Sequence, residues 1–140
     1  MYKVVGWIVL HNSAAEGPGH VDRRRALEAL LAVLRDSWGQ ATKVELHHYN
    51  LDEVLFLHTN NNHESGRSEE LKTFLKDLGR WWPGSYGLVY EYTDDLEESR
   101  WNAYRVLVMV RGVVTDQPDP FFSPIQPTIE DWGGDPEDLA

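Results

Sequence analysis

The sequence predicts an α+β fold, a ferredoxin-like β-α-β-β-α-β sandwich with an extra C-terminal strand and an extended proline-rich tail. Three observations predict it. Short apolar runs alternate with two helical stripes in this order along the chain. The chain has 140 residues, which is the length of one domain. Hydrophobic residues make up 41% of it, enough for a core of its own.

A strand and a helix are predicted first. Val4–Leu10 is apolar at every position, which is typical of a central strand covered on both faces. Asp22 is the expected N-cap of a helix that reaches Trp38, and Gly39 supplies its C-terminal stop. The apolar residues of this helix recur at helical spacing: Leu27, Leu30, Leu31, Leu34 and Trp38.

A hairpin and a second helix are predicted next. Lys43–Tyr49 alternates and Val54–Leu57 is apolar, with turn residues between them, so the two segments are expected to pair. The polar stretch 58–67 is expected to be a loop. Ser68 is the expected N-cap of a helix that a Pro-Gly pair ends. Its stripe has the spacing of the first helix: Leu71, Phe74, Leu75, Leu78 and Trp82.

Two strands and a tail complete the prediction. One strand turns Tyr86, Leu88, Tyr90 and Tyr92 the same way, and an acidic connection leads to a long strand from Trp101 to about residue 111. Five prolines between 116 and 136 exclude a helix or a central strand there. We expect an extended segment that buries four apolar side chains, namely Phe121, Phe122, Ile125 and Ile129. Residues 1–134 then form a single domain, and 135–140 a mobile acidic end.

The negative charge is concentrated in the last third of the chain. Residues 1–90 carry 11 acidic and 10 basic side chains, whereas residues 91–140 carry 12 acidic and three basic ones. Such a field repels nucleic acid, since nucleic-acid binding depends on basic side chains that neutralise phosphates. It attracts a basic protein and speeds the encounter with it.

Several classes of function lack their residues. The chain has no cysteine, which excludes disulfides and thiolate chemistry. We find no phosphate-binding loop, no nucleophile elbow and no complete zinc motif, so we expect neither catalysis nor a cofactor. The longest apolar run has seven residues, far short of a membrane span, and the chain is expected to be cytoplasmic.

Histidines offer an alternative reading. His47, His58 and His63 come from the predicted hairpin and the loop after it, and Glu45 or Glu64 is available to complete a ligand set. His47 and its neighbour His48 must point to opposite faces of a strand, so at most one of them joins such a cluster. A small ligand- or metal-binding domain, or an enzyme built on this region, therefore remains the alternative function.

Several short motifs together resemble the seventh immunity-protein family of bacterial polymorphic toxin systems. They span the chain from residue 6 to residue 131. The chain departs from the family's pattern at Glu64, where we expect a basic residue, and in the connection 94–99. The motifs are Gly6-Trp7, Asn62-His63, Pro83-Gly84-Ser85-Tyr86-Gly87-Leu88-Val89-Tyr90, Arg111-Gly112, Asp119-Pro120-Phe121-Phe122-Ser123-Pro124 and Pro127-Thr128-Ile129-Glu130-Asp131.

The resemblance implies a cytosolic antidote that binds and neutralises one toxin domain and has no catalytic residues of its own. Many toxins of this kind are nucleases with basic clefts, which an acidic protein can fill. We expect a monomer or a weak homodimer, with no direct contact to nucleic acid or membrane. The residues expected to bind the toxin are the acids Asp94, Asp95, Glu97, Glu98, Asp116, Asp119, Glu130 and Asp131 and the aromatic residues Tyr90, Tyr92, Trp81 and Trp101.

Overall fold

Two helices and a six-stranded antiparallel sheet make up the part of the chain that the structure describes, which is residues 1–12, 20–39, 42–50, 52–94 and 103–123 of a computed structural model. The α+β class is therefore confirmed. In chain order the elements are β1 (Tyr2–Leu10), α1 (His20–Trp38), β2 (Thr42–Tyr49), β3 (Asp52–Asn61), α2 (Arg67–Trp81), β4 (Tyr86–Thr93), β5 (Arg105–Val110) and β6 (Val113–Pro118).

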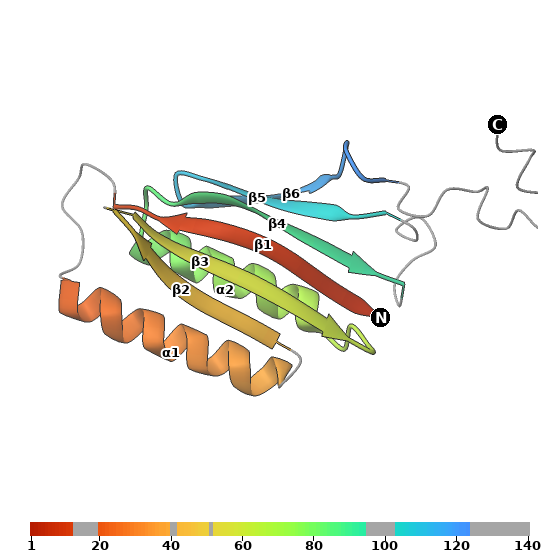
Figure 1. Cartoon of the computed structure of the whole chain (residues 1–140), viewed down its shortest axis with the longest axis horizontal. Coiled ribbons are helices and arrows are strands. Elements are labelled where there is room, and N and C mark those ends of the chain that lie inside the picture. Colours follow the sequence, from red (N-terminus) through yellow and green to blue (C-terminus); the bar gives the residue numbers. More distant parts are fainter. Residues whose placement is uncertain (13–19, 40–41, 51, 95–102, 124–140) are drawn as a thin grey trace, which may run out of the picture.

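The strands lie in the order β2-β3-β1-β4-β5-β6, and each pair of neighbours is antiparallel. β1 lies in the middle and pairs with β3 on one side and with β4 on the other. Both helices pack on the same face of the sheet, and Figure 1 looks onto the opposite face, with the strands in front of α2. Among the described residues, the helices cover one face of the sheet and leave the other face open.

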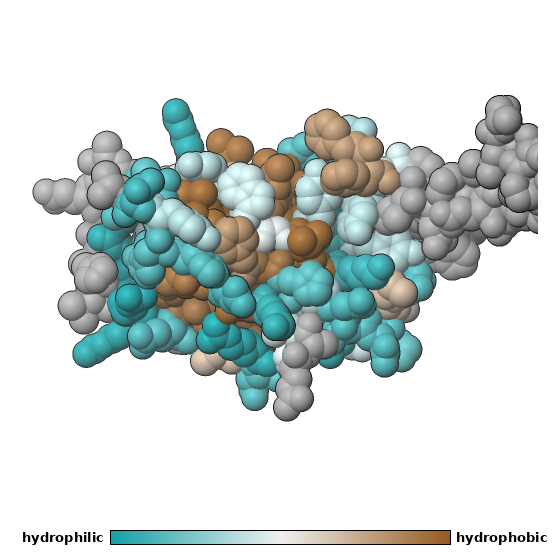
Figure 2. Space-filling view, viewed as in Figure 1, coloured by the Kyte–Doolittle hydropathy of each residue, from teal (hydrophilic) through white to brown (hydrophobic). Residues whose placement is uncertain are grey.

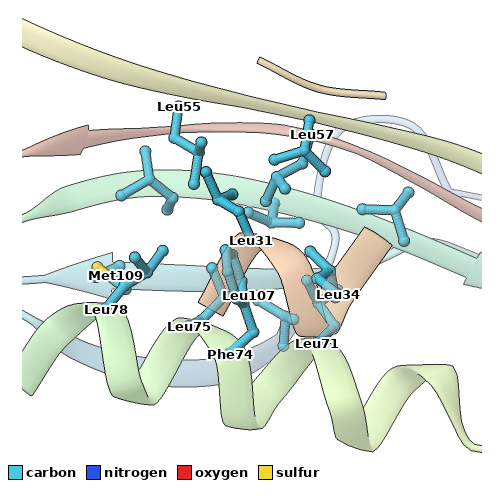
Figure 3. Packing of buried hydrophobic residues seen from close by; sticks show 14 of the residues in the cluster. Leu31, Leu34, Leu55, Leu57, Leu71, Phe74, Leu75, Leu78, Leu107 and Met109 are labelled. Carbon is cyan, nitrogen blue, oxygen red and sulfur yellow. The ribbon is translucent and has the colours of Figure 1, made fainter. Parts of the chain in front are cut away.

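The core fills the space between the sheet and the two helices. Leu31 and Leu34 reach it from α1, whereas Leu55 and Leu57 reach it from β3 (Figure 3). Both predicted helical stripes face this core, with Leu30 half-buried at its margin and the other members buried. The α2 members are Leu71, Phe74, Leu75 and Leu78, followed by Trp82 just after the helix.

The two central strands differ from the prediction. β3 continues to Asn61, so the loop expected from residue 58 is wrong for its first four residues. Their polar side chains tolerate a strand because their backbone pairs with β1 throughout and, at His58 and Thr59, also with β2. The expectation that β1 is covered on both faces is also wrong, since Val5 and Trp7 are 50% and 39% exposed on the open face.

Both expected N-caps are wrong. α1 begins at His20, so Asp22 lies in its first turn. α2 follows Gly66, whose left-handed φ is +79°, and the side chain of Glu64 replaces a serine cap by accepting hydrogen bonds from the backbone N–H groups of Gly66 and Ser68 at 2.9 and 3.0 Å. The C-terminal stop at Gly39 is confirmed, with φ +74°.

The C-terminal part contains an edge strand that the sequence analysis missed. The long strand expected to reach residue 111 is the shorter β5, which ends in a tight turn where Arg111 and Gly112 both have positive φ. β6 then pairs along β5 at the sheet edge, the place where strands tolerate proline. The expected burial of Phe121 and Phe122 is wrong, because they are 77% and 59% exposed. Ile125, Ile129 and residues 135–140 lie outside the described residues.

Candidate functional site

Apolar and aromatic side chains gather on the open face of the sheet. In the register of the strands, Trp7 of β1 lies between Phe56 of β3 and Leu88 of β4, and Val5 lies between His58 and Tyr90. Figure 2 shows apolar and pale aromatic residues in the middle of this face, with hydrophilic residues around them. We call this surface the open face; it comprises Val5, Trp7, Phe56, His58, Tyr86, Leu88, Tyr90 and Tyr92.

Aromatic rings form a cluster toward each end of the open face. At one end the rings of Trp7 and Tyr86 meet edge to face with centroids 6.5 Å apart. At the other end Tyr104 lies 5.8 Å from Tyr90 and 6.0 Å from Tyr92. Edge-to-face pairs hold the rings in fixed orientations, so a partner meets a preformed surface.

A shallow groove of about 270 Å³ lies on the open face where β1, β3 and β2 run side by side. Val5 and Phe56 supply apolar walls, and Lys43, Glu45 and His58 supply polar ones. The groove therefore combines apolar and polar walls.

The aromatic residues that the sequence analysis selected are only partly on this surface. Tyr90 and Tyr92 lie on the open face, as outward-pointing residues of β4. Burial, together with the nearby Asp119 carboxylate, raises the pKa of Tyr90, which therefore stays protonated and neutral at physiological pH. Trp81 is half-buried at the end of α2 against the core, away from the open face. Trp101 lies outside the described residues.

Two of the selected acids pair with cations of the chain itself. Asp94 binds the N-terminal amine at 2.6 Å. Asp116 binds Arg105 at 2.9 Å and Lys72 of α2 at 3.3 Å. Partial burial favours the neutral acid, but the hydrogen bond and charge of Arg105, supported by Lys72, outweigh it and hold the pKa of Asp116 below its usual value.

Asp119 is buried, with only 7% of its surface exposed. Its carboxylate accepts hydrogen bonds from the backbone N–H groups of Phe121 and Phe122 at 2.9 and 2.7 Å and from the Ser123 hydroxyl. Desolvation raises the pKa of Asp119, but these hydrogen bonds prevail and lower it. Asp94, Asp116 and Asp119 thus each bind a different group of the chain. The other selected acids, Asp95, Glu97, Glu98, Glu130 and Asp131, lie outside the described residues.

The histidines are placed apart from one another. His47 pairs with Glu45 at 3.0 Å and stacks on Tyr49, whereas His58 points out of β3 on the open face. The backbone carbonyl of His63 accepts a hydrogen bond from Arg67 before α2. Within the described ranges, no group of three or more His, Asp or Glu side chains is placed to hold a metal ion.

Sequence reasoning missed Val5, Trp7 and Phe56 as surface residues. A signal for them was present in the predicted order of elements. Right-handed crossovers put both helices of such a fold on one side of the sheet. The other face then has no helix to cover it, and the apolar outward positions of its central strands are left exposed.

Comparison with known proteins gives one match. The sequence model of the family described as Immunity protein 7 matches residues 1–131, a span that includes every described residue. No curated protein and no solved structure matches the chain. Neither helix, so far as the structure describes them, is long and apolar enough to cross a membrane.

Proposed function

The chain belongs to the Immunity protein 7 family, and from this premise we propose that it neutralises one cognate bacterial toxin by binding it through the open face. The observation that carries the proposal is the set of large apolar side chains left half-exposed on this face. Val5, Trp7, Phe56 and Tyr86 are between 39% and 50% exposed. In an antiparallel sheet with one solvated face, alternate positions are normally polar, so apolar residues there indicate a surface that a partner covers.

Composition supports this role for the open face. Tryptophan, tyrosine and phenylalanine are the residues that most often anchor protein interfaces, because each buries a large area with few rotatable bonds. The aromatic rings at both ends of the face are fixed by edge contacts, with Trp7 against Tyr86 and Tyr90 against Tyr104. Binding then costs little side-chain entropy.

The toxin is proposed to be basic, of the nuclease type. Twelve of the 23 acidic side chains lie in residues 91–140, and their field speeds the approach of a cationic protein. Asp94, Asp116 and Asp119 contribute to this field while bound within the chain. Direct contacts with the toxin are proposed for Asp95, Glu97, Glu98, Glu130, Asp131 and Trp101. Neutralisation by binding needs no catalysis by the chain, and it takes place in the cytoplasm, where the toxin acts.

The scaffold is proposed to be ferredoxin-like. The sheet order β2-β3-β1-β4, with α1 leading from β1 to β2 and α2 leading from β3 to β4, supports this assignment. β5 and β6 extend the sheet beyond β4 as an added hairpin, and an extended tail after residue 123 remains part of the proposal.

The test is neutralisation of the toxin domain encoded beside this chain's gene. The native chain should protect cells that express the toxin and bind the purified, inactivated toxin domain. Trp7→Ala should weaken binding about 30-fold, since a hot-spot aromatic contributes roughly 2 kcal/mol or more. Val33→Ala is the matched control, because Val33 is an exposed apolar residue on the helix side. Absence of binding by the native chain contradicts the proposed function. Equal binding by both variants contradicts the assignment of toxin binding to the open face.

A further inference from the structure

A second apolar groove lies on the other side of the molecule, between the outer surfaces of α1 and α2. Its volume is about 500 Å³. It belongs to the helix layer, and the whole sheet separates it from the open face. The lining residues are Leu30, Val33, Leu34, Ser37, Glu69, Glu70, Thr73, Phe74 and Asp77.

The groove has an exposed apolar side chain that does not pack in the core. Leu34 and Phe74 are buried and form the floor, and Leu30 is half-buried beside them. Val33, however, is 70% exposed and points away from the sheet, into the groove. Helix surfaces that face water usually carry polar residues at such positions, so Val33 extends the apolar floor toward a potential partner.

The polar part of the groove is acidic. Glu69, Glu70 and Asp77 line it, and none of its lining residues in the described part of the chain is a lysine or an arginine. Lys72 and Arg80 approach Glu69 and Asp77 at 3.5 and 3.4 Å. Each of these pairs has one largely exposed member, which weakens the pairing, and the Glu69 side chain is itself 82% exposed.

Glu70 is held in place within the chain. Its carboxylate accepts a hydrogen bond from the indole N–H of Trp38 at 3.0 Å and another from the hydroxyl of Ser37. These bonds tie the end of α1 to the beginning of α2, so the negative charge at this end of the groove has a fixed position. A cationic group of a partner meets a preorganised carboxylate there.

We propose that this groove docks a short amphipathic helix of a second protein, with lysine or arginine along the side of its apolar stripe that faces α2. A groove between two helices has the shape that receives a third helix through residues spaced three and four apart. From Glu69 to Asp77 the groove extends over nine residues of α2, about 12 Å or two helical turns. The carboxylates on its rim select for positive charge.

Charge also favours a basic helix over two other occupants of the groove, the C-terminal residues of this chain and a second copy of it. Residues 124–140 of the chain contain five acidic side chains and no lysine or arginine, so repulsion disfavours them in the groove. A second copy of the chain carries a net charge of −10 and is disfavoured for the same reason. The proposal goes beyond toxin neutralisation, because the open face and the groove lie on opposite sides and leave room for the toxin and the helix together.

The test uses two synthetic helical peptides of equal length, one of leucine and lysine and one of leucine and glutamate. Fluorescence anisotropy with the full chain should show binding of the lysine peptide only. Val33→Lys should weaken that binding at least tenfold. Val113→Lys is the control, since Val113 is 64% exposed on β6 and makes the same change of charge and size outside the groove. It should change binding less than twofold.

A second pair of variants tests the rim. Glu69→Lys should weaken binding of the lysine peptide about tenfold. Glu28→Lys is the control, because it makes the same change of charge at an exposed position of α1 outside the groove lining. It should weaken binding less than about threefold. Equal effects within either pair, or no binding of the lysine peptide by the native chain, overturn the groove as a docking site.

A further measurement distinguishes the proposed helix from the toxin as the protein that binds the groove. Val33→Lys should still bind the toxin domain and protect cells, because the toxin is assigned to the open face. If this variant loses protection while Val113→Lys keeps it, the groove belongs to the toxin and a second partner is ruled out. If the native chain gives no protection at all, the proposed function fails, whereas the peptide measurement still decides the groove.

Discussion

The two faces of the sheet are built from the same strands but differ in the size and the burial of their side chains. On β4, the residues that face the helices are Gly87, Val89, Glu91 and Thr93, all buried, whereas the residues that face outward are Tyr86, Leu88, Tyr90 and Tyr92. The larger apolar side chains therefore point away from the core. Burial in the folded chain does not account for them, and this is the reason to look for a partner on that side.

The two faces also differ in the environment of their polar side chains. The covered face buries Glu91, which accepts hydrogen bonds from the Tyr2 and Ser68 hydroxyls at 2.9 Å each. Burial, reinforced by the Glu91 charge, raises the pKa of Tyr2 far above its usual value, so Tyr2 remains a donor. The polar groups of the open face, such as Lys43 and Glu45, stay in contact with water. Changes on the covered face should thus affect stability, and changes on the open face should affect binding.

The largest expected effect is at the covered face of β3. Leu57→Ala should lower the free energy of unfolding by about 2–5 kcal/mol, because it removes a 2% exposed side chain and leaves a cavity. Denaturant unfolding followed by tryptophan fluorescence measures the change. A loss below about 1 kcal/mol would remove the distinction between the faces at this position.

A smaller loss is expected from the buried polar network. Glu91→Leu removes the acceptor of two hydroxyl groups, so the buried Tyr2 and Ser68 donors lose a partner at a cost of roughly 1–3 kcal/mol. Glu91→Gln keeps an acceptor and should lose less. If both variants unfold at the same denaturant concentration, the network does not stabilise the fold through these bonds.

A pH-dependent loss is expected from Asp116 and Asp119. Both carboxyl groups have a pKa below the unfolded value of 3.8, so their contribution is complete above that pH and disappears as the pH falls through the lower folded values. Thermal melting between pH 5 and about 2 should show the decline. Asp116→Asn should melt lower than the native chain at pH 5, and the difference should narrow at the acid end. A constant difference over this range would contradict the assignment.

The smallest effect on stability is expected one residue before Leu57. Phe56→Ala should change the free energy of unfolding by less than about 1 kcal/mol, since Phe56 is 39% exposed and loses only cross-strand contacts. The same variant should weaken toxin binding about tenfold. Leu57→Ala, measured where it is still folded, is the matched comparison, and a larger binding defect there than in Phe56→Ala would reverse the roles of the two faces.

The parts of the fold that follow from periodic burial were predictable. Both helical stripes and the order of the first five strands were read from spacing alone, because each element buries one side of itself. The helix starts were not, because Glu64 caps α2 from the position before Ser65 and no serine or aspartate serves as the cap. β6 was missed because the prolines that follow residue 116 were taken to exclude a central strand. The strand lies at the sheet edge, and its one proline, Pro118, is its last residue.

The candidate site was predicted less well than the fold. Tyr90 and Tyr92 were selected, but Trp7 was assigned to a covered strand and Phe56 to an apolar strand of a hairpin. An apolar residue looks the same in the sequence whether a helix or a partner covers it. Glu69 and Glu70 at the start of α2 were not selected, although they line a groove. The charge was counted from the composition, whereas the availability of a carboxylate for a partner depends on its own ion pairs. Asp94, for example, pairs with the N-terminal amine, which lies 93 residues away in the sequence.

Ser85 joins three parts of the chain. Its side-chain oxygen accepts a hydrogen bond from the backbone N–H of His11 after β1, its carbonyl accepts one from Gly112 in the β5–β6 turn, and its N–H donates to Trp82 at the end of α2. Ser85, which lies in the Pro83–Tyr90 motif of the family resemblance, thus stabilises the scaffold. The motifs of this resemblance also contain four residues of the open face, namely Trp7, Tyr86, Leu88 and Tyr90. One stretch of chain thus both holds the scaffold together at Ser85 and shapes the surface proposed to bind the toxin, so a substitution near this junction can alter the two at once.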